Sequence, residues 1–159
     1  MGKSSTDTCC LTLPLKLEKW QEDRLAKRFE IARQIYNTMV RAELKKLERV
    51  KQLPEYRKNQ KEIQALDGKN SADRARLKEL RANQNRILQK QGFTKYGFKS
   101  DSKDYYKHFI ENIGSSVATH CIAPQVWNAF DKMLFQKDGK VVHFKRYFVK
   151  PCFCRILFW

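Results

Sequence analysis

The sequence lacks the features of secreted and membrane-spanning proteins. Its five cysteines form an odd set with one adjacent pair and one Cys-x-Cys, which is not the pattern of a disulfide framework. No apolar run of signal-peptide length stands near its first residue. No stretch approaches the roughly 18 apolar residues that a transmembrane helix needs. We therefore expect a cytoplasmic protein in a reducing environment.

Ligands for a metal ion and groups for catalysis are scarce as well. Neither cysteine pair has the spacing of structural zinc sites, and the three histidines are scattered. No Ser or Cys nucleophile has recognisable flanking residues. Several carboxylates stand among helix-surface cations that can pair with them: Glu43, Glu48, Glu62 and Glu79. We predict no catalytic residue, no metal site and no cofactor, since a two-metal nuclease needs carboxylates that converge.

Basic residues are what the chain has in excess. Lys and Arg number 33 against 17 acidic residues, so that the formal net charge is +16 and the pI is about 9.8. Such an excess predicts a polyanionic partner, because each phosphate that Lys or Arg contacts releases counterions. Nucleic acid is the partner that this charge favours. An anionic membrane surface and a merely solvated basic surface are the alternatives.

Residues 18–135 are predicted to form a helical, nucleic-acid-binding lobe. From Glu18, apolar residues recur at steps of mostly three and four as far as Val50, which indicates a long amphipathic helix. Pro54 can end this helix and begin a second one, and a third is expected to stop at Gly92. These helices would form an antiparallel pair or a three-helix bundle.

Less regular structure is expected after the third helix. Residues 93–103 place three aromatic side chains among lysines and are predicted to be a loop. Short helices should follow, interrupted at Gly114, and the last of them restarts at Pro124 with a dense apolar face.

The ends of the chain differ from this helical part. Residues 1–10 are predicted to be a disordered N-terminus. Leucines alternate with other residues over 11–17. Residues 141–147 include β-branched and aromatic side chains, and both segments are therefore predicted to be strands. Residues 148–159 form an atypical tail, aromatic and apolar with no acidic residue. The expected fold is therefore mainly α, a helical bundle flanked by a few β-strands.

Clusters of cations, some beside aromatic residues, are the candidate binding residues. Aromatic rings can stack on unpaired bases while cations hold the phosphates. Core packing is the alternative, and the sequence favours it for Tyr105, Phe109, Trp127 and Phe130. For Phe93, Lys95 and Tyr96 it favours neither interpretation. The predicted nucleic-acid contacts are Lys45, Lys46, Arg49, Arg57, Lys58, Arg81, Lys95, Tyr96, Lys145 and Arg146.

Four segments resemble the beginning of the OrfB/TnpB family of transposon-encoded proteins, which are related to type V CRISPR effectors. The first is the alternating segment Leu11-Thr-Leu-Pro-Leu-Lys-Leu17, and the second is Ala32-Arg-Gln-Ile-Tyr-Asn37. The third combines Ser116-Val117 with Val126-Trp-Asn-Ala-Phe-Asp-Lys132, and the fourth is Val141-Val-His-Phe-Lys-Arg-Tyr147. Their order and approximate spacing agree over about residues 11–147.

The resemblance implies the N-terminal part of an RNA-guided DNA endonuclease. In that family this part combines a wedge-like β-barrel with a helical recognition lobe, and it binds guide RNA and the guide–target duplex mainly through backbone and shape. Residues 11–17 and 141–147 would then be strands of an incomplete wedge-like barrel, and residues 18–135 the recognition lobe. The partners would be a guide-type RNA or a DNA backbone in a prokaryotic cytoplasm, and no membrane.

The chain departs from the family because the RuvC-like nuclease, with its acidic ligands and Cys-rich insert, has no counterpart here. We therefore expect a truncated TnpB-like protein that keeps nucleic-acid binding and is not an enzyme. An intact homologue or a separately encoded nuclease part would be a further partner. The alternatives are a stand-alone RNA-binding or regulatory module and a helical protein-interaction or membrane-surface module.

Overall fold

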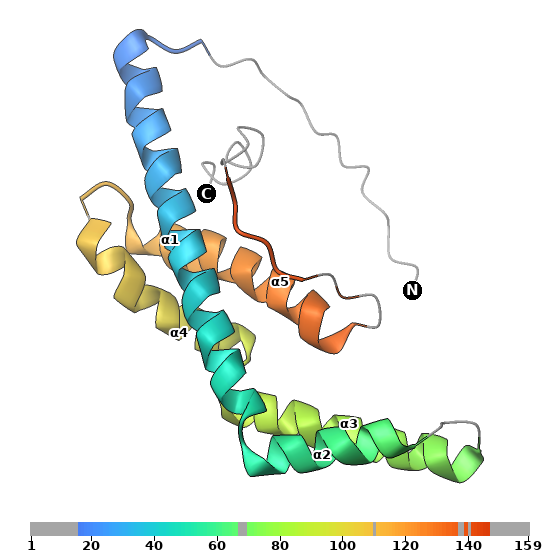
Figure 1. Ribbon diagram of the computed structural model, residues 1–159. Coiled ribbons are helices and arrows are strands. Elements are labelled where there is room, and N and C mark those ends of the chain that lie inside the picture. The colour runs from blue at the N-terminus through green and yellow to red at the C-terminus, as the bar shows by residue number, and fades with distance from the viewer. Residues whose placement is uncertain (1–15, 67–69, 110, 137–138, 140, 147–159) are drawn as a thin grey trace, which may run out of the picture.

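One long helix organises the protein. The structure is a computed structural model that describes residues 16–66, 70–109, 111–136, 139 and 141–146. Helix α1 (Lys19–Lys51) is the longest helix, and α4 and α5 cross its middle while α2 and α3 extend away from its C-terminal end (Figure 1). The side chain of Gln21 accepts a hydrogen bond from the Glu18 N–H at 3.0 Å, which satisfies one of the unpaired donors at the start of the helix.

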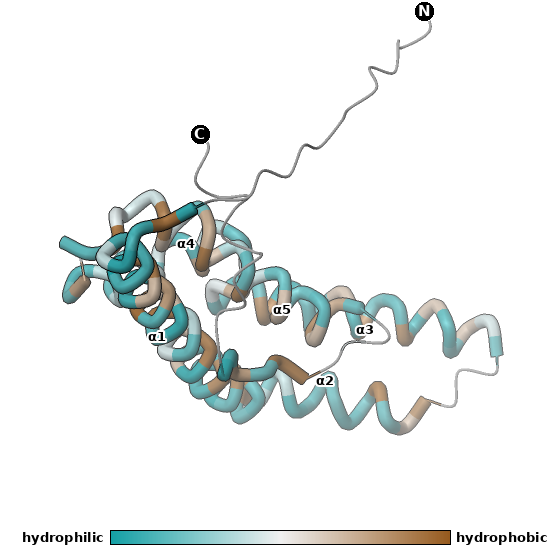
Figure 2. Tube along the Cα trace, turned by 90° about the horizontal axis from the view of Figure 1, so that it is seen from above, coloured by the Kyte–Doolittle hydropathy of each residue, from teal (hydrophilic) through white to brown (hydrophobic). Residues whose placement is uncertain are grey.

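A helical hairpin extends from the C-terminal end of α1. Helix α2 (Pro54–Ala65) begins with proline in its first turn, where no backbone N–H is needed. Helix α3 (Ser71–Lys90) returns antiparallel to it, and Gly92 ends this run at φ +86°, a conformation that favours glycine. The hairpin is mostly hydrophilic (Figure 2), and Leu80 and Leu88 are its only fully buried described residues.

The second half of the chain packs against the middle of α1. It comprises α4 (Lys95–Tyr106), a 3₁₀ turn η1 (Lys107–Phe109), a π-helical segment η2 (Val117–Ile122) and α5 (Ala123–Phe135). Segment η2 continues directly into α5, where Pro124 lies in the first turn. Because α4, η2 and α5 contact one another and also α1, they close a bundle around a shared core.

Aromatic rings fill the centre of this core. Phe93, Phe98 and Phe130 have no exposed surface, and the ring centroid of Phe98 lies 5.3 Å from that of Phe130 and 6.2 Å from that of Phe93. Such burial contributes about 1.5–3 kcal/mol for each large apolar side chain. Phe93 is therefore a core residue, which decides the alternative that its sequence context left open.

The prediction of a mainly helical bundle is confirmed, but the predicted loop at 93–103 is wrong. Helix α4 begins at Lys95 because Thr94 forms its N-cap and accepts a hydrogen bond from the Gly97 N–H at 3.1 Å. Gly97 also permits a close approach, since a Cβ there would lie 2.1 Å from the carbonyl oxygen of Gly92. The aromatic residues of the predicted loop thus lie partly in the core and partly on the surface of α4.

The predicted strand at 141–147 is wrong over its described part, residues 141–146, which form no strand. The side chain of Asn37 accepts from the Lys145 N–H and donates to the Lys145 carbonyl, both at 2.9 Å. Because this amide satisfies both backbone groups, Lys145 needs no neighbouring strand. In the predicted strand at 11–17, residues 16 and 17 form no strand, and 11–15 lie outside the described residues. Residues 1–10 and 148–159 also lie outside them.

Candidate nucleic-acid interface

The ten predicted contact residues come from three regions of the structure. Lys45, Lys46 and Arg49 lie on the C-terminal half of α1, near Lys95 and Tyr96 at the start of α4. Arg57, Lys58 and Arg81 lie on the hairpin formed by α2 and α3. Lys145 and Arg146 lie in the segment after α5, beside α1.

On α1, the structure separates Lys46 from the two cations near it. Lys45 and Arg49 are exposed, whereas Lys46 is half-buried and contacts α4. The Lys46 ammonium donates to the Asp101 carboxylate at 3.0 Å and lies over the ring of Phe93 at 5.4 Å from the centroid. Lys46 therefore joins α1 to α4, and only Lys45 and Arg49 of the predicted trio present their charge to solvent.

Lys46 also approaches a buried carboxylate, Glu43, which is 2% exposed. The Lys46 Nζ lies 3.5 Å from Glu43 Oε2, and no hydrogen bond from a described residue reaches that oxygen. Burial raises the pKa of Glu43 to about 7, the positive charge of Lys46 opposes this rise, and the neighbouring Asp101 carboxylate adds to it. This cluster holds α1 and α4 together, with Glu43 buried inside it and the side chains of Lys46 and Asp101 partly exposed.

Two shallow grooves run along the hairpin, and basic side chains line both. The first has a volume of about 600 Å³, and its lining residues are Lys51, Tyr56, Arg57, Gln60 and Lys61. The second has a volume of about 420 Å³, and its lining residues are Arg74, Leu77, Lys78, Arg81, Ala82 and Asn85. Among the residues that the structure describes, no acidic residue lines either groove. The grooves therefore combine positive charge with neutral hydrogen-bonding groups, the chemistry that phosphate oxygens require.

Two acidic residues of the hairpin, Glu62 and Glu79, are engaged on another of its faces. Arg76 donates to Glu79 at 2.8 Å on the same helix and to Glu62 at 3.2 Å on α2. The Gln84 amide donates to Gln60 at 2.9 Å between the helices. These contacts align α2 with α3. Exposed ion pairs of this kind contribute little stability, so the hairpin depends mainly on its few apolar contacts.

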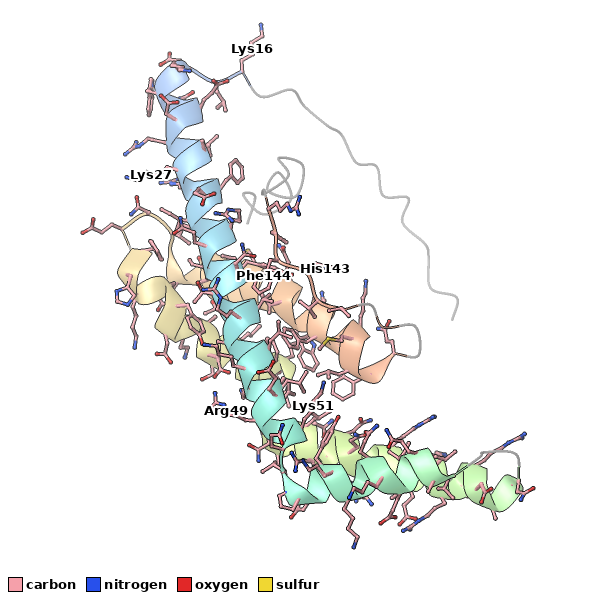
Figure 3. All side chains as sticks on the ribbon, viewed as in Figure 1. Lys16, Lys27, Arg49, Lys51, His143 and Phe144 are labelled. Carbon is pink, nitrogen blue, oxygen red and sulfur yellow. The ribbon has the colours of Figure 1, made fainter. Side chains whose placement is uncertain are left out.

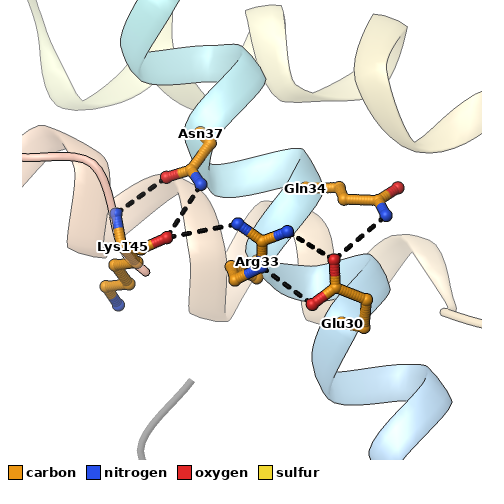
Figure 4. Close-up of polar contacts among 5 residues, drawn as sticks. All are labelled: Glu30, Arg33, Gln34, Asn37 and Lys145. Carbon is orange, nitrogen blue, oxygen red and sulfur yellow. Dashed lines mark hydrogen bonds and ion pairs between the residues drawn. The ribbon is translucent and has the colours of Figure 1, made fainter. Parts of the chain in front are cut away.

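In the third region, Lys145 makes its contacts within the protein (Figure 4). Besides its backbone bonds to Asn37, its ammonium donates to Gln125 at 2.6 Å and lies 4.3 Å from the ring centroid of Tyr36. Arg33 also donates to the Lys145 carbonyl, at 3.4 Å, and is held by Glu30. Arg146, the next residue, is exposed. Lys145 thus anchors its segment to α1 and α5.

Sequence reasoning selected some cations that serve the core and left out others that line the grooves. Lys51, Lys61 and Lys78 lie on a groove but were not among the ten predicted contacts. For Lys78 a signal was present, because Arg74, Lys78, Arg81 and Asn85 recur at steps of three and four on one helix face. The exposed side chains of Arg49 and Lys51 project from the junction of α1 and the hairpin (Figure 3).

Within the part of the chain that the structure describes, no three His, Cys, Asp or Glu side chains form a group that could hold a metal ion. Among the same residues, every helix is too short or too polar to cross a membrane. No protein-family model, curated protein or solved structure matches the chain.

Proposed function

We propose that this protein is a nucleic-acid-binding module without a catalytic centre of its own. The observation that carries the proposal is the pair of hairpin grooves, whose described lining residues are cations, neutral polar residues and two apolar residues, with no acidic residue among them. Phosphate oxygens along a nucleic-acid backbone complement such a surface.

The spacing of the groove cations suits a repeating anion. Lys78 and Arg81 are three residues apart on α3, a rise of about 4.5 Å along the helix. Phosphates along one strand of a duplex recur every 3.4 Å of helix axis. Neighbouring cations on α3 can therefore meet nearby phosphates of one backbone, which favours contacts that do not depend on base sequence.

Lys45 and Arg49 extend this surface onto α1. Both are exposed, and they lie on the last two turns of α1 before the hairpin. Lys51, at the end of α1, lines the first groove, so the basic surface continues from α1 onto α2.

The resemblance to the N-terminal part of TnpB-type proteins supports the same class of partner. On that resemblance the partner is a guide-type RNA or the DNA backbone, and the helical bundle corresponds to a recognition lobe. We propose this relationship on the four sequence segments and their order. It agrees with the mainly helical fold, in which exposed cations lie along α1 and on the hairpin.

Paired charge reversals test whether the proposed surface binds phosphate. Lys78→Glu combined with Arg81→Glu should lower the affinity for an RNA of about 30 nucleotides. It should also reduce the slope of log affinity against log salt by roughly one for each lost phosphate contact. Lys45→Glu combined with Arg49→Glu should act in the same direction.

The matched control is Lys27→Glu combined with Arg28→Glu, two exposed cations on the N-terminal half of α1. It changes the net charge by the same amount at a distance from the hairpin. We expect a smaller loss of affinity and an unchanged salt slope. An equal effect of all three pairs on affinity and slope would mean that binding follows net charge alone and would contradict the proposed surface.

A further inference from the structure

The turn that connects α3 to α4 has a closely defined backbone. Gly92 adopts φ +86°, and the Phe93 N–H returns to the Leu88 carbonyl at 3.1 Å. The Thr94 N–H then donates to the Gly92 carbonyl at 2.8 Å, and the Thr94 side chain caps α4. Gly97 packs against the same Gly92 carbonyl. The first turn of α4 is therefore fixed by hydrogen bonds and by close packing.

Tyr96 stands out from the aromatic residues on either side of it. Phe93 and Phe98 are completely buried, whereas the side chain of Tyr96 is 81% exposed. It is more exposed than any other large hydrophobic residue that the structure describes. Among the described residues its ring contacts no other ring and its hydroxyl makes no hydrogen bond. A closely defined turn thus places an aromatic ring in solvent without a partner among the described residues.

Lysines neighbour Tyr96 along the chain, and the carboxylate nearest to it in the sequence is already paired. Lys95 precedes Tyr96 and is exposed, and Lys99 follows three residues later, on the same side of the helix. Lys90, at the end of α3, is exposed as well. Asp101 accepts the hydrogen bond from Lys46 at 3.0 Å. The local surface therefore combines a free aromatic face with uncompensated positive charge.

We infer that Tyr96 is a stacking platform for an unpaired nucleobase, with Lys95 and Lys99 placed to contact the adjoining phosphates. The inference rests on the proposed function and adds that the ligand exposes at least one unstacked base near the start of α4. A ring in solvent can stack on any base, while cations beside it hold the backbone. Because the hydrogen bonds of the turn fix the backbone there, binding has to order only the side-chain torsions of Tyr96.

Three proteins and three ligands test this inference. The proteins are the wild type, Tyr96→Ala and Tyr96→Phe. The ligands are a single-stranded RNA of about 20 nucleotides, a duplex of the same length, and a single strand of the same length whose central nucleotides are abasic. Dissociation constants are measured by fluorescence anisotropy at low salt. Thermal unfolding of all three proteins should coincide, because residue 96 is exposed.

We expect Tyr96→Ala to weaken binding of the single strand roughly 5- to 150-fold, the range that corresponds to one stacked base. Tyr96→Phe should bind like the wild type, since the ring is retained. Duplex affinity should be unchanged in both variants. The abasic strand should bind to the wild type and to Tyr96→Ala equally, because it offers no base at the platform.

The outcomes separate the two proposals. If wild type and Tyr96→Ala bind the single strand equally well, Tyr96 does not stack on a base, and the proposed function is unaffected. An equal loss for single strand and duplex would also overturn the inference, since stacking on an unpaired base cannot produce it. If none of the proteins binds any of the ligands, the proposed function itself is contradicted.

Discussion

The buried carboxylate of Glu43 should make the stability of this protein fall as the pH rises towards neutrality. Glu43 is 2% exposed and faces Lys46 on its own helix and Asp101 on α4. Its pKa rises from 4.5 to about 7, chiefly because burial disfavours the charged form. Replacing it with Gln, which keeps the shape and removes the titrating proton, isolates this effect.

The size and sign follow from the two pKa values. The folded state keeps the Glu43 proton up to about pH 7, whereas the unfolded chain releases it near 4.5. The stability that the Glu43 proton contributes is therefore fully present below pH 4.5, and it is lost as the pH rises from 4.5 through 7. At 1.36 kcal/mol for each pH unit, the loss is about 3 kcal/mol. For a chain of this size, that corresponds to a fall of roughly 6–12 °C in the melting temperature.

Urea denaturation of wild type and Glu43→Gln between pH 4.5 and 8 measures this contribution. The other titrating groups are common to both proteins, so the difference in unfolding free energy between them reports Glu43 alone. We expect Glu43→Gln to gain about 3 kcal/mol relative to wild type from the acidic to the alkaline end of this range. A difference that stays constant with pH would show that Glu43 ionises in the folded state as it does in water.

Three further substitutions test the packing. Gly97→Ala should destabilise the fold by about 3 kcal/mol in urea denaturation, because its Cβ would lie 2.1 Å from the Gly92 carbonyl oxygen. Gly114→Ala, where an added Cβ would lie 3.8 Å from the Ser116 hydroxyl, should change stability by less than about 0.5 kcal/mol, and equal effects would refute the account of the α3–α4 turn. Asn37→Ala should cost about 1–3 kcal/mol and accelerate amide exchange at Lys145, and unchanged exchange there would contradict the role of the Asn37 side chain.

Periodicity predicted the first three helices well, because the spacing of apolar residues along the sequence indicates which face of a helix is buried. The apolar stripe of α1 and the breakers Pro54 and Gly92 set three helix boundaries close to where the structure has them. These signals are local, so they need no knowledge of tertiary contacts. The lysines and aromatics of residues 93–103 suggested a loop and concealed the start of α4, which Thr94 caps.

Tertiary contacts decided the features that sequence reasoning missed. The β-branched and aromatic residues of 141–146 fit a strand, but the side chain of Asn37, more than 100 positions away, takes both backbone bonds of Lys145. Lys46 and Lys145 look like surface cations in the sequence, and each is half-buried against an aromatic ring. The local sequence pattern does not show where a cation lies relative to the core. The predicted contact residues therefore include both cations that line the grooves and cations that anchor a segment to the core.

The most direct test of nucleic-acid binding is a salt titration of the wild-type protein. Anisotropy of a labelled RNA of about 30 nucleotides is measured from about 50 to 200 mM salt, with anionic vesicles as a separate ligand. We predict measurable binding at low salt and a linear fall of log affinity with log salt, with a slope of about 0.7 for each phosphate contacted on a single strand. Absence of RNA binding at low salt, or an affinity that does not change with salt, would contradict the account.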